Sequence, residues 1–135
     1  MSHMVLVDSV VITSVSRLEK ACQKLGLVLD MNKHQARYYG GNTQSCAGVV
    51  QIPGVDWDIA VLPAEKGRND KFFLAGDFYG STGKKVEGAM AKLTQKYVEL
   101  EAIDLYTRQM SNTSIVNKTV SADGTITLEV AVTGG

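Results

Sequence analysis

The chain has 135 residues, enough for one domain and too few for two ordinary ones, so we expect a single domain over residues 1–135. Its 14 Lys and Arg residues balance its 14 Asp and Glu residues, which argues against a dedicated nucleic-acid binder and favours self-association. No apolar run reaches membrane-spanning length, and two cysteines make no disulfide framework. Because the first four residues also lack the basic and apolar regions of a signal peptide, we expect a soluble cytoplasmic protein.

The first part of the chain carries a strand signal followed by a helix signal. Residues 4–13 are mostly β-branched and apolar, which predicts a strand, and Asp8 and Ser9 interrupt its alternation as a bulge would. The capping-box pattern Ser16-Arg17-Leu18-Glu19 then predicts the start of an amphipathic helix. Gly26 can adopt the left-handed conformation that ends such a helix.

The middle of the chain predicts a series of short strands. We expect them at residues 27–29, 36–39, 47–52, 56–62 and 71–79. Gly40-Gly41-Asn42 indicates a turn after the second of them. In the fourth strand the alternation is clean, which places Trp57, Ile59 and Val61 on one face.

A long helix and two further strands complete the chain. Gly80-Ser81-Thr82-Gly83 separates the last of the short strands from a helix that ends near Gln109. Its apolar residues recur in steps of three and four, at Val86, Met90, Leu93, Tyr97, Leu100 and Ile103. Strands are expected at 115–120 and 125–132, joined by a turn at 121–124. This order predicts an α+β fold with a mostly antiparallel sheet and two helices packed on one face.

Several short motifs follow one another in a fixed order. They are Met1-Ser2-His3, Tyr39-Gly40-Gly41-Asn42-Thr43, Asp58-Ile59, Leu74-Ala75-Gly76-Asp77-Phe78-Tyr79-Gly80, Gln95-Lys96-Tyr97 and Asp123-Gly124-Thr125-Ile126. Together they resemble the hypothetical chloroplast reading frame thirty-five family, a domain of unknown function in cyanobacteria, plastids, other bacteria and some phages. The chain departs from that family's pattern at Gln44, at Phe78-Tyr79, which replaces a Trp pair, and at Lys96. Because members often sit near AAA+ ATPase genes, the resemblance implies an accessory role and no chemistry.

Two segments are candidates for ligand contact. The first lies between a strand and a helix, where free amides attract anions, and consists of Gly80, Ser81, Thr82, Gly83, Lys84 and Lys85. The segment does not match the phosphate-loop pattern. Two interpretations stay open: it contacts an anion or nucleotide, or it is a plain capped loop. The second is aromatic and consists of Tyr38, Tyr39, Phe78 and Tyr79. These side chains form a stacking surface for a base or a peptide, or they belong to the core.

The acidic residues Asp56, Asp58 and Asp77 allow a third interpretation. If their strands are neighbours, they form a carboxylate cluster that could bind a cation or belong to an enzyme; otherwise they lie on a solvated strand face. The histidines, His3 and His34, form no metal-ligand pattern with the cysteines, and no catalytic motif is present.

These observations predict a non-enzymatic accessory or binding protein that needs no metal or cofactor. We expect a protein partner, for which the resemblance suggests an AAA+ ATPase, and homo-oligomers. The alternative is a protein that binds a nucleotide or another small anion. The Gly134-Gly135 tail is similar to the tails of ubiquitin-like modifiers, and a frayed terminus explains it as well.

Overall fold

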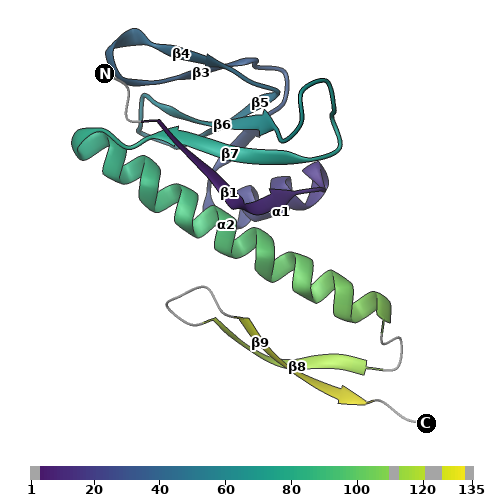
Figure 1. Cartoon of the computed structure of the whole chain (residues 1–135). Coiled ribbons are helices and arrows are strands. Elements are labelled where there is room, and N and C mark those ends of the chain that lie inside the picture. The colour runs from purple at the N-terminus through teal and green to yellow at the C-terminus, as the bar shows by residue number, and fades with distance from the viewer. Residues whose placement is uncertain (1–3, 110–112, 121–125, 133–135) are drawn as a thin grey trace. The chain divides into compact units, whose positions relative to one another are not determined.

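The computed structural model describes residues 4–109, 113–120 and 126–132 (Figure 1). The opening motif, the expected turn at 121–124 and the Gly134-Gly135 tail therefore lie outside the described residues. In the described part, no helix is both long enough and apolar enough to cross a membrane.

The chain divides into two compact units, Met1–Thr94 and Gln95–Gly135. Helix α2 (Gly80–Gln109) runs from the first unit into the second. The expectation of a single domain over residues 1–135 stays a prediction. The fold is α+β, as the sequence predicts, with a mostly antiparallel sheet and two helices.

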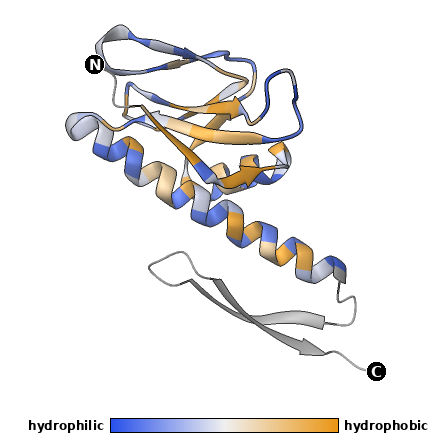
Figure 2. Ribbon diagram, in the orientation of Figure 1, coloured by the Kyte–Doolittle hydropathy of each residue, from blue (hydrophilic) through white to orange (hydrophobic). Residues whose placement is uncertain are grey.

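The first unit is built on a five-stranded sheet in the order β1-β7-β6-β5-β2. Its strands are β1 (Met4–Ile12), β2 (Val28–Asp30), β5 (Gly48–Gln51), β6 (Asp58–Pro63) and β7 (Phe72–Asp77). Each pairing within it is antiparallel. The register of β1 shifts between Val7 and Ile12, which confirms the irregularity expected at Asp8 and Ser9. Figure 2 shows apolar residues concentrated in these strands and polar residues in the loops between them.

Helices α1 (Val15–Leu25) and α2 lie on one side of this sheet in Figure 1, as predicted. The contact with α2 is close at Gly76 of β7. A Cβ atom there would stand 2.7 Å from Sδ of Met90 and 2.8 Å from Cγ1 of Val86. Glycine avoids this crowding, because a Cβ atom at position 76 would force the side chains of Val86 and Met90 to shift.

Helix α1 begins two residues earlier than the sequence predicts. Its N-cap is Ser14, whose hydroxyl accepts a hydrogen bond of 3.1 Å from the backbone N–H of Arg17. The expected capping box at Ser16 is therefore wrong, because Val15 already has helical geometry and a serine further upstream supplies the cap. The stop is confirmed: Gly26 is left-handed, with φ 72°.

A small hairpin covers the other side of the sheet. It consists of β3 (Gln35–Arg37) and β4 (Thr43–Ser45), of which the sequence predicted only the first. Ala36 and Tyr38 pack on Val49, Ala60 and Ala75, which the register places side by side on β5, β6 and β7. Two of the three residues in this row are alanines, which leave room for the aromatic ring to lie close to the sheet.

The hairpin turns at Tyr39–Gly41, where Gly40 and Gly41 adopt φ values of 71° and 76°. Two successive left-handed residues strongly favour glycine, which explains the Gly-Gly pair. The N–H of Tyr38 closes the turn by donating to the carbonyl of Asn42 at 2.8 Å. The turn expected from Gly40-Gly41-Asn42 is confirmed.

The apolar stripe of α2 is buried along most of its length. Its members Val86, Met90, Leu93 and Tyr97 are buried, while Leu100 and Ile103 are half-buried. The second unit contains the end of α2 and an antiparallel hairpin of β8 (Thr113–Val120) and β9 (Ile126–Val132). The bounds of these strands are close to those predicted, 115–120 and 125–132.

Candidate functional site

The buried carboxylate of Asp58 binds the hairpin to the sheet. Asp58 is only 1% exposed, and its Oδ2 accepts from the backbone N–H and from Nε of Arg37, each at 3.0 Å. Its Oδ1 accepts from Nη2 of Arg37 at 2.8 Å. The hydrogen bond to Asp58 raises the pKa of the Arg37 guanidinium. Both carboxylate oxygens are therefore used to hold β3 against β6.

Asp77 performs a similar task at the end of β7. It is 1% exposed, and its oxygens accept from the backbone N–H groups of Tyr39 at 3.1 Å and Tyr79 at 3.0 Å. Two of the motifs quoted above, at residues 39–43 and 74–80, thus meet at a single carboxylate. Asp77 fixes the start of the hairpin turn relative to the segment that leads into α2.

The three aspartates do not share one environment. Asp56 is exposed, which fits a solvated surface, but that interpretation is wrong for Asp58 and Asp77, because both are buried and hydrogen-bonded to backbone amides. Across the described residues, no group of three His, Cys, Asp or Glu side chains could hold a metal ion.

The backbone held by Asp77 presents the rings of Tyr39 and Tyr79, and Trp57 lies beside Tyr39; we call these three residues the aromatic cluster. The ring centroids of Tyr39 and Tyr79 are 4.4 Å apart, and those of Tyr39 and Trp57 are 5.9 Å apart in an edge-to-face arrangement. Tyr39 is 43% exposed and Tyr79 41% exposed, while Trp57 is half-buried. These rings form a surface patch whose backbone is held at Tyr39 and Tyr79 by Asp77.

Tyr38 and Phe78, the other two aromatic candidates, are less accessible. Phe78 is half-buried and Tyr38 is buried in the hairpin core. Trp57 was missed because the alternation of 56–62 placed it with Ile59; in the structure it precedes β6, and its ring contacts Tyr39. The available signal was the position of Trp57 near the start of the predicted strand, 56–62.

The Tyr38 hydroxyl is an unusual feature of the core beneath the hairpin. Its oxygen is buried and has no hydrogen-bond partner among the described residues. Burial, followed by the nearby acidic groups of Cys46, Asp77 and Asp58, raises the pKa of Tyr38. A buried hydroxyl without a partner is destabilising, so the ring occupies this position for its apolar contacts.

The segment from Gly80 to Lys85 forms the first turns of α2 instead of a separate loop. Gly83 is buried there, its N–H donates to the Tyr79 carbonyl at 2.9 Å, and a Cβ on it would collide with the Phe78 backbone. The glycine is therefore explained by tight packing of the chain. Ser81, Lys84 and Lys85 are exposed, and anion binding by this segment stays a prediction.

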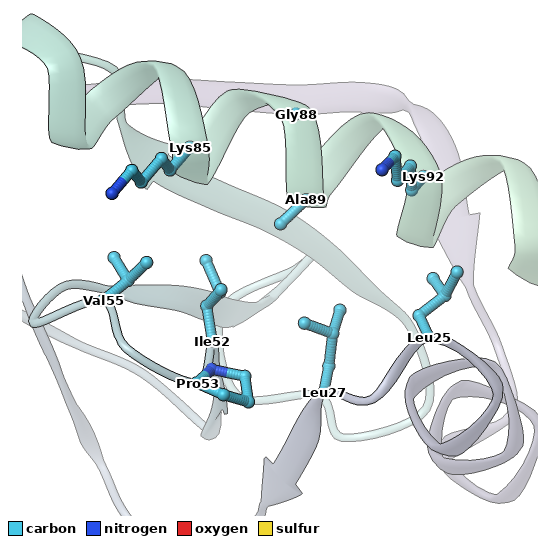
Figure 3. A pocket seen from close by; sticks show the side chains of 9 residues that line it. All are labelled: Leu25, Leu27, Ile52, Pro53, Val55, Lys85, Gly88, Ala89 and Lys92. Carbon is cyan, nitrogen blue, oxygen red and sulfur yellow. The ribbon is translucent and has the colours of Figure 1, made fainter.

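A groove of about 480 Å³ runs along α2 on the first unit (Figure 3). Helix α2 contributes Lys85, Gly88, Ala89 and Lys92 to one wall. The facing wall is aliphatic and comes from the end of α1 and the segment after β5, at Leu25, Leu27, Ile52, Pro53 and Val55. The groove therefore combines an apolar interior with positive charge.

A second hollow, of about 700 Å³, lies near the open side of the β3–β4 hairpin. His34, Cys46 and Phe72 are among its lining residues. Burial raises the pKa of the Cys46 thiol, which disfavours the reactive thiolate. We therefore consider this hollow a weaker candidate for a functional site than the groove along α2.

The chain matches no family model, no curated protein and no solved structure. The resemblance of its motifs to the chloroplast reading frame thirty-five family stays a prediction.

Proposed function

We propose that this chain is a non-catalytic binding protein that recognises a protein partner through the aromatic cluster. The observation that carries the proposal is the pair of rings at Tyr39 and Tyr79, each about two-fifths exposed and 4.4 Å apart on backbone fixed by Asp77. Exposed aromatic residues that are ordered before binding lose little conformational freedom in the complex, and such residues dominate many interfaces.

The acidic residues around the cluster support binding in preference to catalysis. Asp58 and Asp77 are occupied by hydrogen bonds that hold the backbone. Asp56, next to Trp57, is exposed and would repel the phosphates of a nucleic acid. A protein partner fits this patch better than a nucleic acid.

The motif resemblance suggests which partner to test first. The segments 39–43 and 74–80, which carry much of the resemblance, are also the segments that supply Tyr39 and Tyr79. Because that resemblance implies an accessory role beside an AAA+ ATPase, an ATPase of this class is the first partner we propose.

The test is affinity capture from the source cell with quantitative mass spectrometry, using three baits. We expect the wild-type chain to retain an ATPase of this class and the double variant Tyr39→Ala, Tyr79→Ala to lose it. Tyr106→Ala is the matched control, because Tyr106 is 41% exposed but lies at the other end of α2. Equal retention by all three baits, or capture of no partner by the wild-type chain, would refute the proposal.

We also propose that the protein self-associates through β1. This strand is at an edge of the sheet, and Met4, Val5 and Leu6 on it are exposed. An unpaired apolar edge is a template for pairing with another strand. Light scattering should give a mass above that of the monomer for the wild-type chain and a monomer mass for Leu6→Lys, whereas a monomeric wild-type chain would reject this interface.

A further inference from the structure

Within the part of the chain that the structure describes, no packing contact explains the glycine at position 88. It lies inside α2, where glycine is less stable than alanine, and a Cβ atom on it would meet nothing within 4 Å. Gly76 and Gly83 differ, because a Cβ on Gly76 would crowd the side chains of Val86 and Met90 and one on Gly83 would collide with the Phe78 backbone. The cost of Gly88 is therefore not explained by contacts within the described residues.

The place of Gly88 in the groove suggests an explanation. Gly88 and Ala89 lie between Lys85 and Lys92 along α2, and Figure 3 shows Ala89 pointing toward the facing wall. Close approach of another backbone is a common reason for glycine at such a position. The volume of about 480 Å³ is within the range of ligand-sized pockets.

The charges of the groove indicate what would occupy it. Lys85 and Lys92 are both exposed. Because they are seven residues apart, they lie on the same side of α2, separated by about 10 Å along the helix. None of the groove's lining residues is acidic. A helix lying along α2 would place its own residues i and i+7 beside the lysines and residues i+3 and i+4 against Gly88 and Ala89.

We infer that this groove binds an amphipathic helix of a partner protein, with two large apolar residues between acidic residues seven positions apart. The apolar side chains enter the aliphatic wall at Leu27, Ile52 and Val55, and the carboxylates face Lys85 and Lys92. This occupant fits better than a small anion, because two lysines two turns apart with an apolar floor between them match an extended amphipathic surface.

The first test uses the whole chain and fluorescein-labelled helical peptides in fluorescence anisotropy. One peptide carries the core Glu-Ala-Ala-Leu-Leu-Ala-Ala-Glu, a second has both Glu replaced by Lys, and a third has both Leu replaced by Ser. We expect binding of the first alone, weakened by salt. Failure of the first peptide to bind at about 1 mM, or equal binding of all three, would overturn the inference.

The second test uses variants of the protein. Gly88→Leu should raise the melting temperature of the free chain and weaken binding of the first peptide by about tenfold or more, because the added side chain fills the groove. Lys85→Ala should weaken it about two- to fivefold, whereas Lys84→Ala, which removes a neighbouring lysine that does not line the groove, should leave it unchanged. Unchanged affinity of Gly88→Leu would contradict the assignment. The double variant Tyr39→Ala, Tyr79→Ala should bind the peptide normally, so the groove and the aromatic cluster are tested separately.

Discussion

Arg37 and Asp58 are joined by three hydrogen bonds, although they are 21 positions apart in the chain. The Asp58 side chain is 2% exposed, while that of Arg37 is 52% exposed. The arginine therefore covers a carboxylate that is almost inaccessible to water, while about half of its own side chain stays exposed. The layer formed by the β3–β4 hairpin depends on this pair, together with the contacts of Tyr38.

Removal of the Arg37 side chain should destabilise the protein strongly. Arg37→Ala leaves the Asp58 carboxylate buried with one remaining donor, so we expect the free energy of unfolding to fall by about 3 kcal/mol. Arg37→Lys should recover only part of the loss, because lysine cannot form the paired bonds to both oxygens. Urea denaturation measures both effects. Arg68→Ala is the control: its ion pairs with Glu65 and Asp70 are exposed, and its loss should change stability by less than about 1 kcal/mol. Equal effects of the two alanine variants would contradict the account.

Removal of the buried hydroxyl of Tyr38 should not destabilise the protein. Tyr38→Phe keeps the ring against Ala60 and Ala75 and deletes an oxygen that has no described partner, so we expect a gain of about 1 kcal/mol in the free energy of unfolding. Chemical denaturation provides the measurement. Tyr39→Phe, whose residue is exposed, should leave stability unchanged within about 0.5 kcal/mol. A loss of stability in Tyr38→Phe would show that the hydroxyl has a partner.

Stability should decrease above pH 9, in part because of Cys22. Burial, with a further contribution from Glu19, raises the pKa of this thiol from 9.0 to about 12. The unfolded chain releases the proton from about pH 9 upward while the folded chain retains it, so the stabilisation is complete below pH 9 and is lost as the pH rises toward 12. The slope from this group is at most about 1.4 kcal/mol per pH unit. Urea denaturation should show that the free energy of unfolding decreases less for Cys22→Ala than for the wild-type chain between about pH 8 and about pH 10. Parallel curves of the free energy of unfolding against pH would refute the assignment.

Two glycines of the same helix should respond in opposite ways to alanine. Gly83→Ala forces a methyl group against the Phe78 backbone, and we expect a loss of at least about 3 kcal/mol or failure to fold. Gly88→Ala places the methyl in open space and should raise the free energy of unfolding by about 0.5–1 kcal/mol. Thermal melts of the two variants check both signs. A destabilised Gly88→Ala variant would mean that the glycine has a structural role in the free protein.

The elements that the sequence predicted well depend on local signals. The alternation through Ile59 and Val61, the left-handed stop at Gly26 and the stripe of α2 each follow from neighbouring residues in the chain. The second layer was not predictable in this way. Strand β4 carries no apolar run, and it is held in place by distant contacts: Tyr38 packs against three strands, and Asp58 bonds Arg37.

The candidate site also combines residues that local sequence signals identify with contacts that only the fold creates. The two tyrosines of the aromatic cluster are among the aromatic candidates that the sequence offers, but their contact depends on Asp77, which is 38 positions from Tyr39. A carboxylate that accepts from two backbone amides has no sequence signature. The groove was missed for a related reason, because its apolar wall comes from two separate segments that only the fold brings beside α2.

Trp57 is the only tryptophan of the chain, and it lies in the aromatic cluster, which allows a direct test of the proposed function. The chain would be labelled with fluorotryptophan, which gives a single fluorine NMR signal, and titrated with the partner identified by affinity capture. Docking on the cluster predicts that this signal shifts or broadens as the complex forms, and that Tyr39→Ala, Tyr79→Ala abolishes the change. A signal that stays unchanged while the two proteins co-elute as a complex would contradict the central claim.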